Sequence, residues 1–190
     1  MKKGIQRLDD ILFYNKEFVE NKKYEQYETS KHPEKKMVVL SCMDTRLTEL
    51  LPQAMNIKNG DAKIVKNAGA TIMHPFGSIV RSILVAVYEF EAEDLFVVGH
   101  YGCGMSNLDG GLLLEKMKKR GVTQMTIDTL QYSGIDVESW LHGFESEKAA
   151  VEESVEALVN HPLMPSGVRV HGLLMDPATG KLDVVIDASK

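Results

Sequence analysis

The sequence predicts an α/β domain with a mostly parallel central β-sheet flanked by helices, and an antiparallel edge strand supplied by a C-terminal hairpin. Two observations predict this fold class. Short apolar runs rich in β-branched residues alternate with longer segments whose apolar residues recur at helical spacing. Two further runs near the C-terminus are separated by "DPATG" at 176–180, whose residues are typical of a tight turn.

Five segments are predicted to be strands. The run "MVVL" at 37–40 is short and apolar, which is typical of a strand covered on both faces. The segments at 62–68 and 94–100 have similar composition and follow it along the chain. The last two strands, 168–175 and 181–186, flank the predicted turn and form the hairpin.

The segments between these strands are predicted to be helices. Residues 7–24 begin with an amphipathic pattern in which Leu8, Ile11 and Leu12 recur at helical spacing. The other expected helices lie at 49–56, 76–90, 112–119, 122–132 and 145–159. Thr48 is expected to cap the helix at 49–56.

Length and composition indicate one globular domain spanning residues 1–190. Hydrophobic residues make up 44% of the chain, and the formal net charge of −5 argues against nucleic acid or an anionic membrane as a partner. No stretch is long and apolar enough to cross a bilayer, and the charged N-terminus does not resemble a secretory signal. We therefore expect a cytoplasmic protein with reduced cysteines.

The two cysteines of the chain both follow predicted strands. Cys42 comes after the first strand, and His100 and Cys103 lie three residues apart in "GHYGCG" at 99–104, after the third. In open α/β sheets, sites lie beyond the carboxyl ends of the strands. Zinc accepts thiolate and imidazole ligands, and three protein ligands leave a fourth position open for catalysis. The spacing therefore predicts a metal site.

Each of these residues also has a structural interpretation. A buried cysteine often packs as a small apolar side chain, and a histidine after a strand often only forms a hydrogen bond. A disulfide between Cys42 and Cys103 is a further alternative, which a reducing compartment disfavours. A nucleophile elbow around Cys103 does not fit, because Tyr101 and Met105 stand where glycines would be needed.

Two charged residues follow Cys42 at alternating positions in "CMDTR". Side chains two residues apart in an extended segment point the same way, so Arg46 can bind the carboxylate of Asp44 through its planar fork. This pairing would hold Asp44 ionised close to the metal, where it accepts a hydrogen bond from bound water or becomes the fourth ligand. The alternative is a surface salt bridge that contributes little.

These motifs resemble those of the β-class carbonic anhydrases. That family carries Cys-x-Asp-x-Arg and, further along the chain, His-x-x-Cys. "KNAGA" at 66–70 resembles the Arg-Asn-Ala-Gly segment of the family, and "GLLMDPATGKL" at 172–182 resembles its closing hairpin. The resemblance covers residues 37–110 and 168–186, and it is to the shorter bacterial members.

The resemblance implies one Zn²⁺ per chain, bound by Cys42, His100 and Cys103. It also implies that Asp44 and Arg46 are the catalytic pair that governs access to the fourth metal position. The expected reaction is the reversible hydration of CO₂ to bicarbonate and a proton by zinc-bound hydroxide. CO₂ and bicarbonate are accordingly the expected small-molecule partners.

The resemblance further implies a homodimer, sometimes paired into tetramers, in which a helical arm formed by residues 1–30 packs on a partner subunit. Two departures bear on the substrate: Lys66 stands where the family has arginine, and Lys58 lies where many members have glutamine. Two other functions therefore stay open, namely hydrolysis of carbonyl sulfide or carbon disulfide at the same site, and bicarbonate binding without turnover. The intact Asp44 and Arg46 disfavour the latter.

Overall fold

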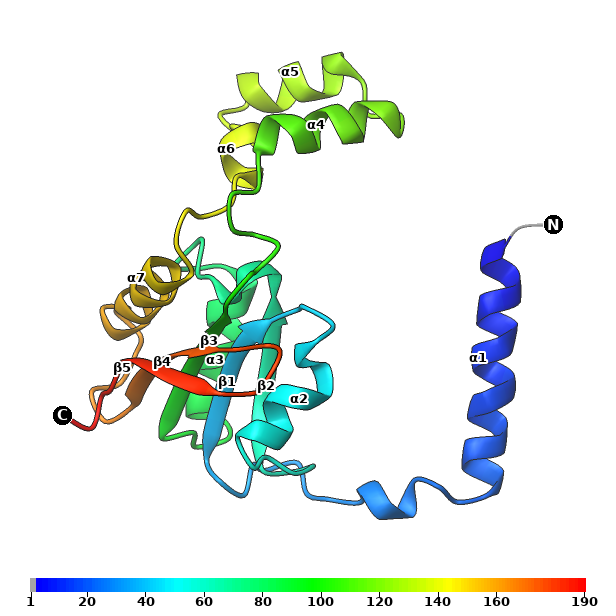
Figure 1. Ribbon diagram of the computed structural model, residues 1–190, viewed down its shortest axis with the longest axis vertical. Coiled ribbons are helices and arrows are strands. Elements are labelled where there is room, and N and C mark those ends of the chain that lie inside the picture. Colours follow the sequence, from blue (N-terminus) through cyan, green and yellow to red (C-terminus); the bar gives the residue numbers. More distant parts are fainter. Residues whose placement is uncertain (1–2) are drawn as a thin grey trace. The chain divides into compact units, whose positions relative to one another are not determined.

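The computed structural model describes residues 3–190, with side chains described from residue 7 onward (Figure 1). The chain divides into two compact units, Met1–His32 and Pro33–Lys190. The first unit holds helix α1 (Lys3–Glu20) and a short 3₁₀ helix, η1 (Glu25–Tyr27). The predicted helix at 7–24 is therefore too long at its C-terminal end. Lys22 has a φ of 53°, a left-handed conformation that ends an α-helix.

The second unit is built on a single five-stranded sheet in the order β2-β1-β3-β4-β5 (Figure 1). The β1–β2, β1–β3 and β3–β4 pairs are parallel, and β4–β5 is antiparallel. The predicted fold class is confirmed. The strands are β1 (Met37–Cys42), β2 (Ala62–Asn67), β3 (Asp94–His100), β4 (Arg169–Met175) and β5 (Leu182–Ile186).

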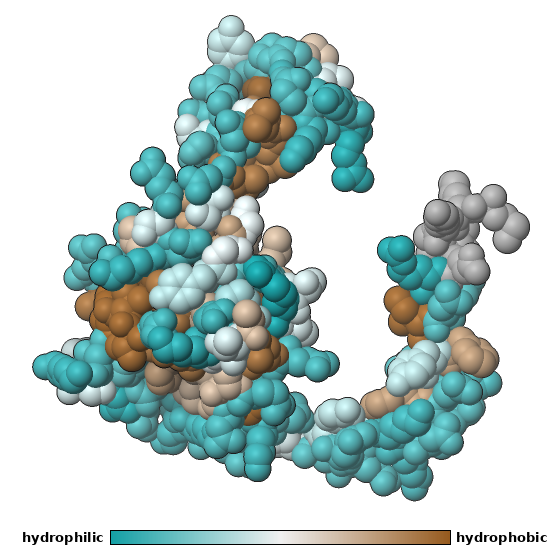
Figure 2. All heavy atoms as spheres, in the orientation of Figure 1, coloured by the Kyte–Doolittle hydropathy of each residue, from teal (hydrophilic) through white to brown (hydrophobic). Residues whose placement is uncertain are grey.

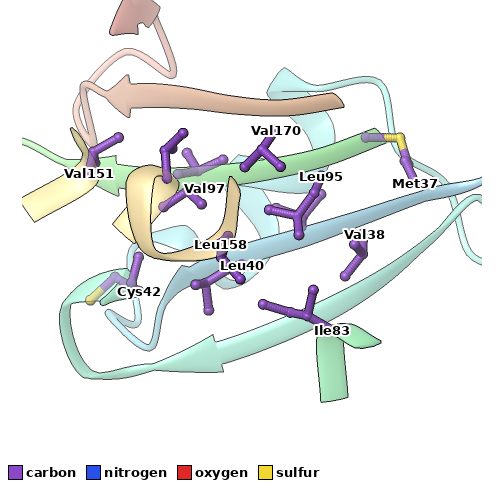
Figure 3. Packing of buried hydrophobic residues seen from close by; sticks show 14 of the residues in the cluster. Met37, Val38, Leu40, Cys42, Ile83, Leu95, Val97, Val151, Leu158 and Val170 are labelled. Atoms are coloured by element: carbon purple, nitrogen blue, oxygen red, sulfur yellow. The ribbon is translucent and has the colours of Figure 1, made fainter. Parts of the chain in front are cut away.

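The core lies between the sheet and the helices on its faces. All six residues of β1 are buried, as expected for a central strand covered on both sides. Figure 3 shows Val38, Leu40 and Cys42 following one another along this core. The helices of this part are α2 (Leu47–Ala54), α3 (Ser78–Tyr88) and α7 (Glu147–Val159), together with the 3₁₀ helix η2 (Ala68–Ala70).

Helix α7 approaches the sheet at two glycines. A Cβ atom at Gly99 would lie 2.7 Å from Cγ2 of Val151, and one at Gly172 would lie 2.8 Å from Cγ1 of the same residue. Real Cβ atoms essentially never come this close to a neighbour. The glycines of β3 and β4 therefore allow α7 to rest directly on the strand backbone just before His100.

Helix α2 begins earlier than predicted, at Leu47, and Thr48 lies inside it. Asp44 is the reason, because its Oδ1 accepts the backbone N–H of Arg46 at 2.9 Å and its carbonyl accepts that of Leu47 at 3.1 Å. This turn leads the chain into the helix directly after Arg46, which occupies the N-cap position. The expected Thr48 cap is wrong.

Three helices form an insertion between β3 and α7: α4 (Gly110–Lys119), α5 (Gln124–Tyr132) and α6 (Val137–Leu141). Gly110 and Leu114 are the only residues of these three helices that are buried. Figure 2 shows hydrophobic side chains among hydrophilic ones on this part of the surface. Helix α6 was not predicted, because five residues are too few to show a helical period. Among the described residues, no helix combines the length and apolar character of a membrane span.

The insertion is joined to the core by two chain segments that lie side by side. The N–H of Gly143 donates to the carbonyl of Leu108 at 2.9 Å, and the N–H of Asn107 donates to that of Phe144 at 2.8 Å. A third bond runs from the N–H of Phe144 to the carbonyl of Met105 at 3.2 Å. We call these segments, 105–108 and 143–144, the neck of the insertion.

Candidate metal centre

The fold brings the three predicted ligands together at the carboxyl edge of the sheet. Cys42 ends β1, His100 ends the adjacent parallel strand β3, and Cys103 follows in the next turn. All three are buried. One ring nitrogen of His100 and the two Sγ atoms lie within 4.8 Å of one another. In the described part of the chain, these three residues form the group that could hold a metal ion.

The turn between His100 and Cys103 depends on one glycine. Gly102 has a φ of 61°, in the left-handed region that other residues rarely adopt. Nothing lies within 4 Å of the position where its Cβ would be, so conformation rather than space is what the glycine provides. This turn returns the chain so that Cys103 lies near Cys42, with 3.8 Å between the two sulfurs.

The imidazole of His100 is held so that one nitrogen stays free. Its Nδ1 lies 3.0 Å from the carbonyl oxygen of Tyr101, which can only accept, so Nδ1 carries the proton. Nε2 is buried and has no hydrogen-bond partner among the groups that the structure describes. A buried polar atom left unpaired is costly, and metal-binding histidines commonly donate their other nitrogen to a carbonyl.

The two thiols differ in acidity. Burial opposes ionisation of Cys42, but the nearby His100 ring and the backbone N–H groups of Asp44 and Gly69 outweigh it, and the pKa of Cys42 falls to about 7. Burial and the negative charge on Cys42 raise the pKa of Cys103 to about 11. The thiolate of Cys42 in turn raises the pKa of His100. A divalent cation would relieve this conflict, because metal binding favours both thiolates and a neutral imidazole.

The site fits a tetrahedral metal ion. Zinc–sulfur bonds of about 2.3 Å at tetrahedral angles place two sulfurs about 3.8 Å apart, and the Sγ atoms of Cys42 and Cys103 are separated by 3.8 Å. A disulfide would need about 2.05 Å, and both cysteines are free. The unpaired Nε2 of His100 supplies the third donor.

Asp44 and Arg46 lie beside this group and form a two-pronged ion pair. The Nε of Arg46 donates to Oδ1 of Asp44 at 2.9 Å, and its Nη2 donates to Oδ2 at 2.7 Å. These hydrogen bonds hold the pKa of Asp44 well below its usual range. Oδ2 also lies 3.8 Å from the Nε2 of His100. The Asp44 side chain is only 18% exposed and that of Arg46 is 48% exposed, so the carboxylate lies at the centre while the guanidinium stays half exposed.

Three further groups support the centre and were not predicted from the sequence. The carbonyl of Tyr101 orients His100, and that of Gly102 accepts Nη2 of Arg46 at 3.1 Å. The ammonium of Lys66, whose pKa is lowered by burial, donates to the carbonyl of Cys42 at 3.2 Å. The carbonyls of Tyr101 and Gly102 belong to the backbone of the metal-binding turn. Residue types alone do not reveal where such backbone groups point.

Comparison with known proteins identifies the family. A family model described as "Carbonic anhydrase" matches residues 37–182. The candidate carbonic anhydrase YtiB of Bacillus subtilis (strain 168) is 56% identical over 180 residues, which cover 95% of this chain and 96% of YtiB. A carbon disulfide hydrolase of Acidianus sp. (strain A1-3) is 29% identical over 160 residues, covering 78% and 76% of the two chains.

The solved structures agree. The crystal structure of β-carbonic anhydrase isoform I from Trichomonas vaginalis superposes with a TM-score of 0.85 at 30% identity, covering 99% of this chain and 100% of the other. The chain belongs to the carbonic anhydrase family, in its β class. The resemblance seen in the sequence motifs is therefore confirmed. The members of this family are enzymes.

Proposed function

We propose that this chain is a zinc-dependent carbonic anhydrase that catalyses the reversible hydration of CO₂ to bicarbonate and a proton. The observation that carries the proposal is the buried, unpaired Nε2 of His100, 3.8 Å from an ionised carboxylate, in a ring that has one nitrogen within 4.8 Å of two free thiols. The family match and the 56% identity to YtiB support the same conclusion.

Cys42, His100 and Cys103 would hold one zinc ion per chain. When bound, zinc lowers the pKa of a water molecule and provides a nucleophile near neutral pH. The two thiolates cancel the charge of the ion, and the carbonyl of Tyr101 keeps the imidazole in the tautomer whose Nε2 is free.

Asp44 acts as an acceptor and orienting group. Because Arg46 holds its pKa far below neutrality, Asp44 stays ionised and is a poor store for the proton released by the reaction. Its Oδ2 would accept a hydrogen bond from a water molecule entering the centre, or would itself serve as a further ligand of the metal. The proton then leaves to buffer through other groups.

A hydrolase of carbonyl sulfide or carbon disulfide is the second candidate. The observation in its favour is the relative from Acidianus, whose name states carbon disulfide hydrolase. The identity of 29% to that protein, against 56% to YtiB, favours CO₂ as the substrate. Binding of bicarbonate without turnover has no support from the site, because Asp44 and Arg46 are both present and paired.

The proposal extends to assembly and location. Leu8, Ile11, Leu12 and Val19 of α1 are between 52% and 58% exposed, and this spacing places apolar side chains along the helix. We expect the arm, residues 1–30, to pack on a second copy in a homodimer or tetramer, with residues 1–190 acting as one zinc-binding domain. Two free thiols at the centre suit the reducing cytoplasm.

Metal analysis and stopped-flow kinetics test the proposal together. The purified chain should contain about one zinc per chain, and Cys103→Ser should lose it. Stopped-flow hydration of CO₂, with hydrolysis of carbonyl sulfide and carbon disulfide measured beside it, ranks the two enzymatic candidates. A zinc-replete chain that turns over none of the three substrates would overturn the proposal.

A further inference from the structure

Tyr101, the residue between His100 and the glycine of the turn, is held by three groups. Its N–H donates to the carbonyl of Met175 at the end of β4, at 3.0 Å. Its carbonyl accepts the Nδ1 proton of His100, at 3.0 Å. Its phenol donates to Oδ2 of Asp183 on β5, at 3.1 Å. One residue therefore links the metal-binding turn to both strands of the hairpin.

Asp183 is well placed to accept this hydrogen bond. It lies on the edge strand β5, directly opposite Leu174 of β4, and its carboxylate also pairs with Lys181 at 2.7 Å. Lys181 and Tyr101 lower the pKa of Asp183, so its carboxylate is ionised at neutral pH. Hydrogen bonds from a neutral donor to a charged acceptor are stronger than those between neutral groups.

The turn is held from the opposite side as well. Nη2 of Arg46 donates to the carbonyl of Gly102, one residue after Tyr101. Two successive peptide groups of the turn are thus fixed by charged side chains, one from the segment after β1 and one, through the phenol, from β5. The ring of His100, whose Nδ1 donates to the carbonyl of Tyr101 in this turn, is completely buried.

We propose that Tyr101 and Asp183 are positioning residues for the metal centre, acting on His100 through the peptide carbonyl of Tyr101. The phenol–carboxylate bond fixes the peptide plane of Tyr101, and the carbonyl of that peptide fixes the rotation of the imidazole. The direction of Nε2 toward the two thiols depends on that rotation. This inference rests on the proposed function only in requiring that Cys42, His100 and Cys103 bind a metal.

The experiment measures zinc retention instead of activity alone. Zinc transfer from the loaded protein to a chromophoric chelator is followed for Tyr101→Phe and Asp183→Ala. Each variant removes one partner of the hydrogen bond, and neither side chain is buried. Groups that orient metal ligands typically change metal affinity by about 10-fold to 100-fold. Because the carbonyl itself remains, we expect zinc loss about 10-fold faster in both variants.

Two further variants separate positioning from general stability. Asp183→Asn keeps an acceptor for the phenol and should recover most of the retention. Lys181→Met removes the other partner of Asp183 without touching Tyr101, and it is the matched control that should release zinc at the wild-type rate. The visible spectrum of the cobalt-substituted protein should change in Tyr101→Phe and Asp183→Ala, and not in Lys181→Met.

The double variant completes the test. If one hydrogen bond carries the effect, Tyr101→Phe with Asp183→Ala should lose zinc no faster than either single variant. Wild-type zinc retention in the single variants, or effects that multiply in the double variant, would overturn the inference. Failure of the proposed function is distinguishable, because a zinc-replete wild-type chain would then turn over none of the three substrates, while the zinc-retention assay would still report on Tyr101 and Asp183.

Discussion

The two ends of β3 carry the same three residue types in similar arrangements. At the carboxyl end, Asp44 receives two hydrogen bonds from the side chain of Arg46 and lies 3.8 Å from Nε2 of His100. At the amino end, Asp94 receives two hydrogen bonds from Arg169, both of 2.6 Å, and lies 3.4 Å from Nε2 of His171. An aspartate, an arginine and a histidine are therefore not by themselves a signature of a catalytic centre.

The two sites differ in whether the histidine keeps a ring nitrogen without a hydrogen-bond partner. Nδ1 of His171 accepts the N–H of Ala188 at 3.2 Å, so its Nε2 carries the proton and donates to Asp94. Its ring also stacks on Phe96, with 4.8 Å between ring centroids. In His100, by contrast, Nδ1 donates its proton to a carbonyl, and the buried Nε2 has no hydrogen-bond partner. The comparison teaches that an unpaired atom, together with the thiols, marks the candidate metal centre.

Replacing each histidine in turn by glutamine should give the largest difference in zinc content and activity between the two ends of β3. We expect His100→Gln to lose zinc and to reduce CO₂ hydration to background, because it removes one of three metal donors. His171→Gln should retain both zinc and activity, because His171 only joins Asp94 to the C-terminal segment. Zinc per chain and stopped-flow hydration measure both. Full zinc content in His100→Gln would contradict the assignment of His100, and not His171, to the metal centre.

The two aspartates should differ next most strongly. Asp44→Asn should lower kcat/KM by about 100-fold, the lower end of the range for removing one preorganised hydrogen-bonding group from a reacting centre. Asp94→Asn should leave kcat/KM within about twofold, since substitutions away from a site act mainly on stability. The zinc content of Asp44→Asn should stay near one per chain. Similar losses of activity in both variants would show that the two ends are not distinct.

The pH dependence of activity sharpens the contrast. In the proposed mechanism, the two thiolates and Asp44 would place negative charge around the reacting water, which would favour its protonated form. Hydration of CO₂ should therefore become faster from neutral into alkaline pH. Asp44→Asn removes one negative charge, so its profile should move to lower pH, whereas Asp94→Asn should not shift it. A wild-type profile that is flat from about pH 6 to pH 9 would contradict this charge argument.

The smallest expected effect is on stability, at the amino end of β3. The hydrogen bonds from Arg169 lower the pKa of Asp94. The ionised pair therefore stabilises the fold above the unfolded pKa of about 3.9, and this contribution is lost as the pH falls through the lower folded value. Asp94→Asn should lower Tm by about 2 °C at pH 7. The difference from wild type should shrink as thermal scans move toward pH 3, and growth of the difference would contradict the prediction.

The sequence was sufficient for the sheet and for the members of the candidate centre. The apolar runs predicted all five strands, and the rule that sites lie at carboxyl strand ends placed Cys42 and His100 on one edge. The structure confirms the closeness of these residues, while their roles stay predictions. The spacing of Asp44 and Arg46 predicted their pairing. The expected extended segment is wrong, because Arg46 has helical dihedral angles and the two residues pair within a turn.

Contacts between residues far apart in the chain could not be predicted. Tyr101 and Asp183 are 82 residues apart, and Asp94 and Arg169 are 75 apart. Both contacts depend on the register of β3, β4 and β5, which apolar runs do not specify. The start of α2 was missed because the side chain of Asp44 competes locally with the Thr48 cap.

The neck of the insertion has a consequence for how the protein can vary. The chain departs just after Cys103 and comes back at Gly143, and the two segments are bonded to each other at the point of departure. Within the described residues, no hydrogen bond joins residues 109–142 to the turn that holds His100 and Cys103. We therefore expect changes of length or sequence in residues 109–142, or a module grafted there, to affect zinc binding less than changes in the neck itself.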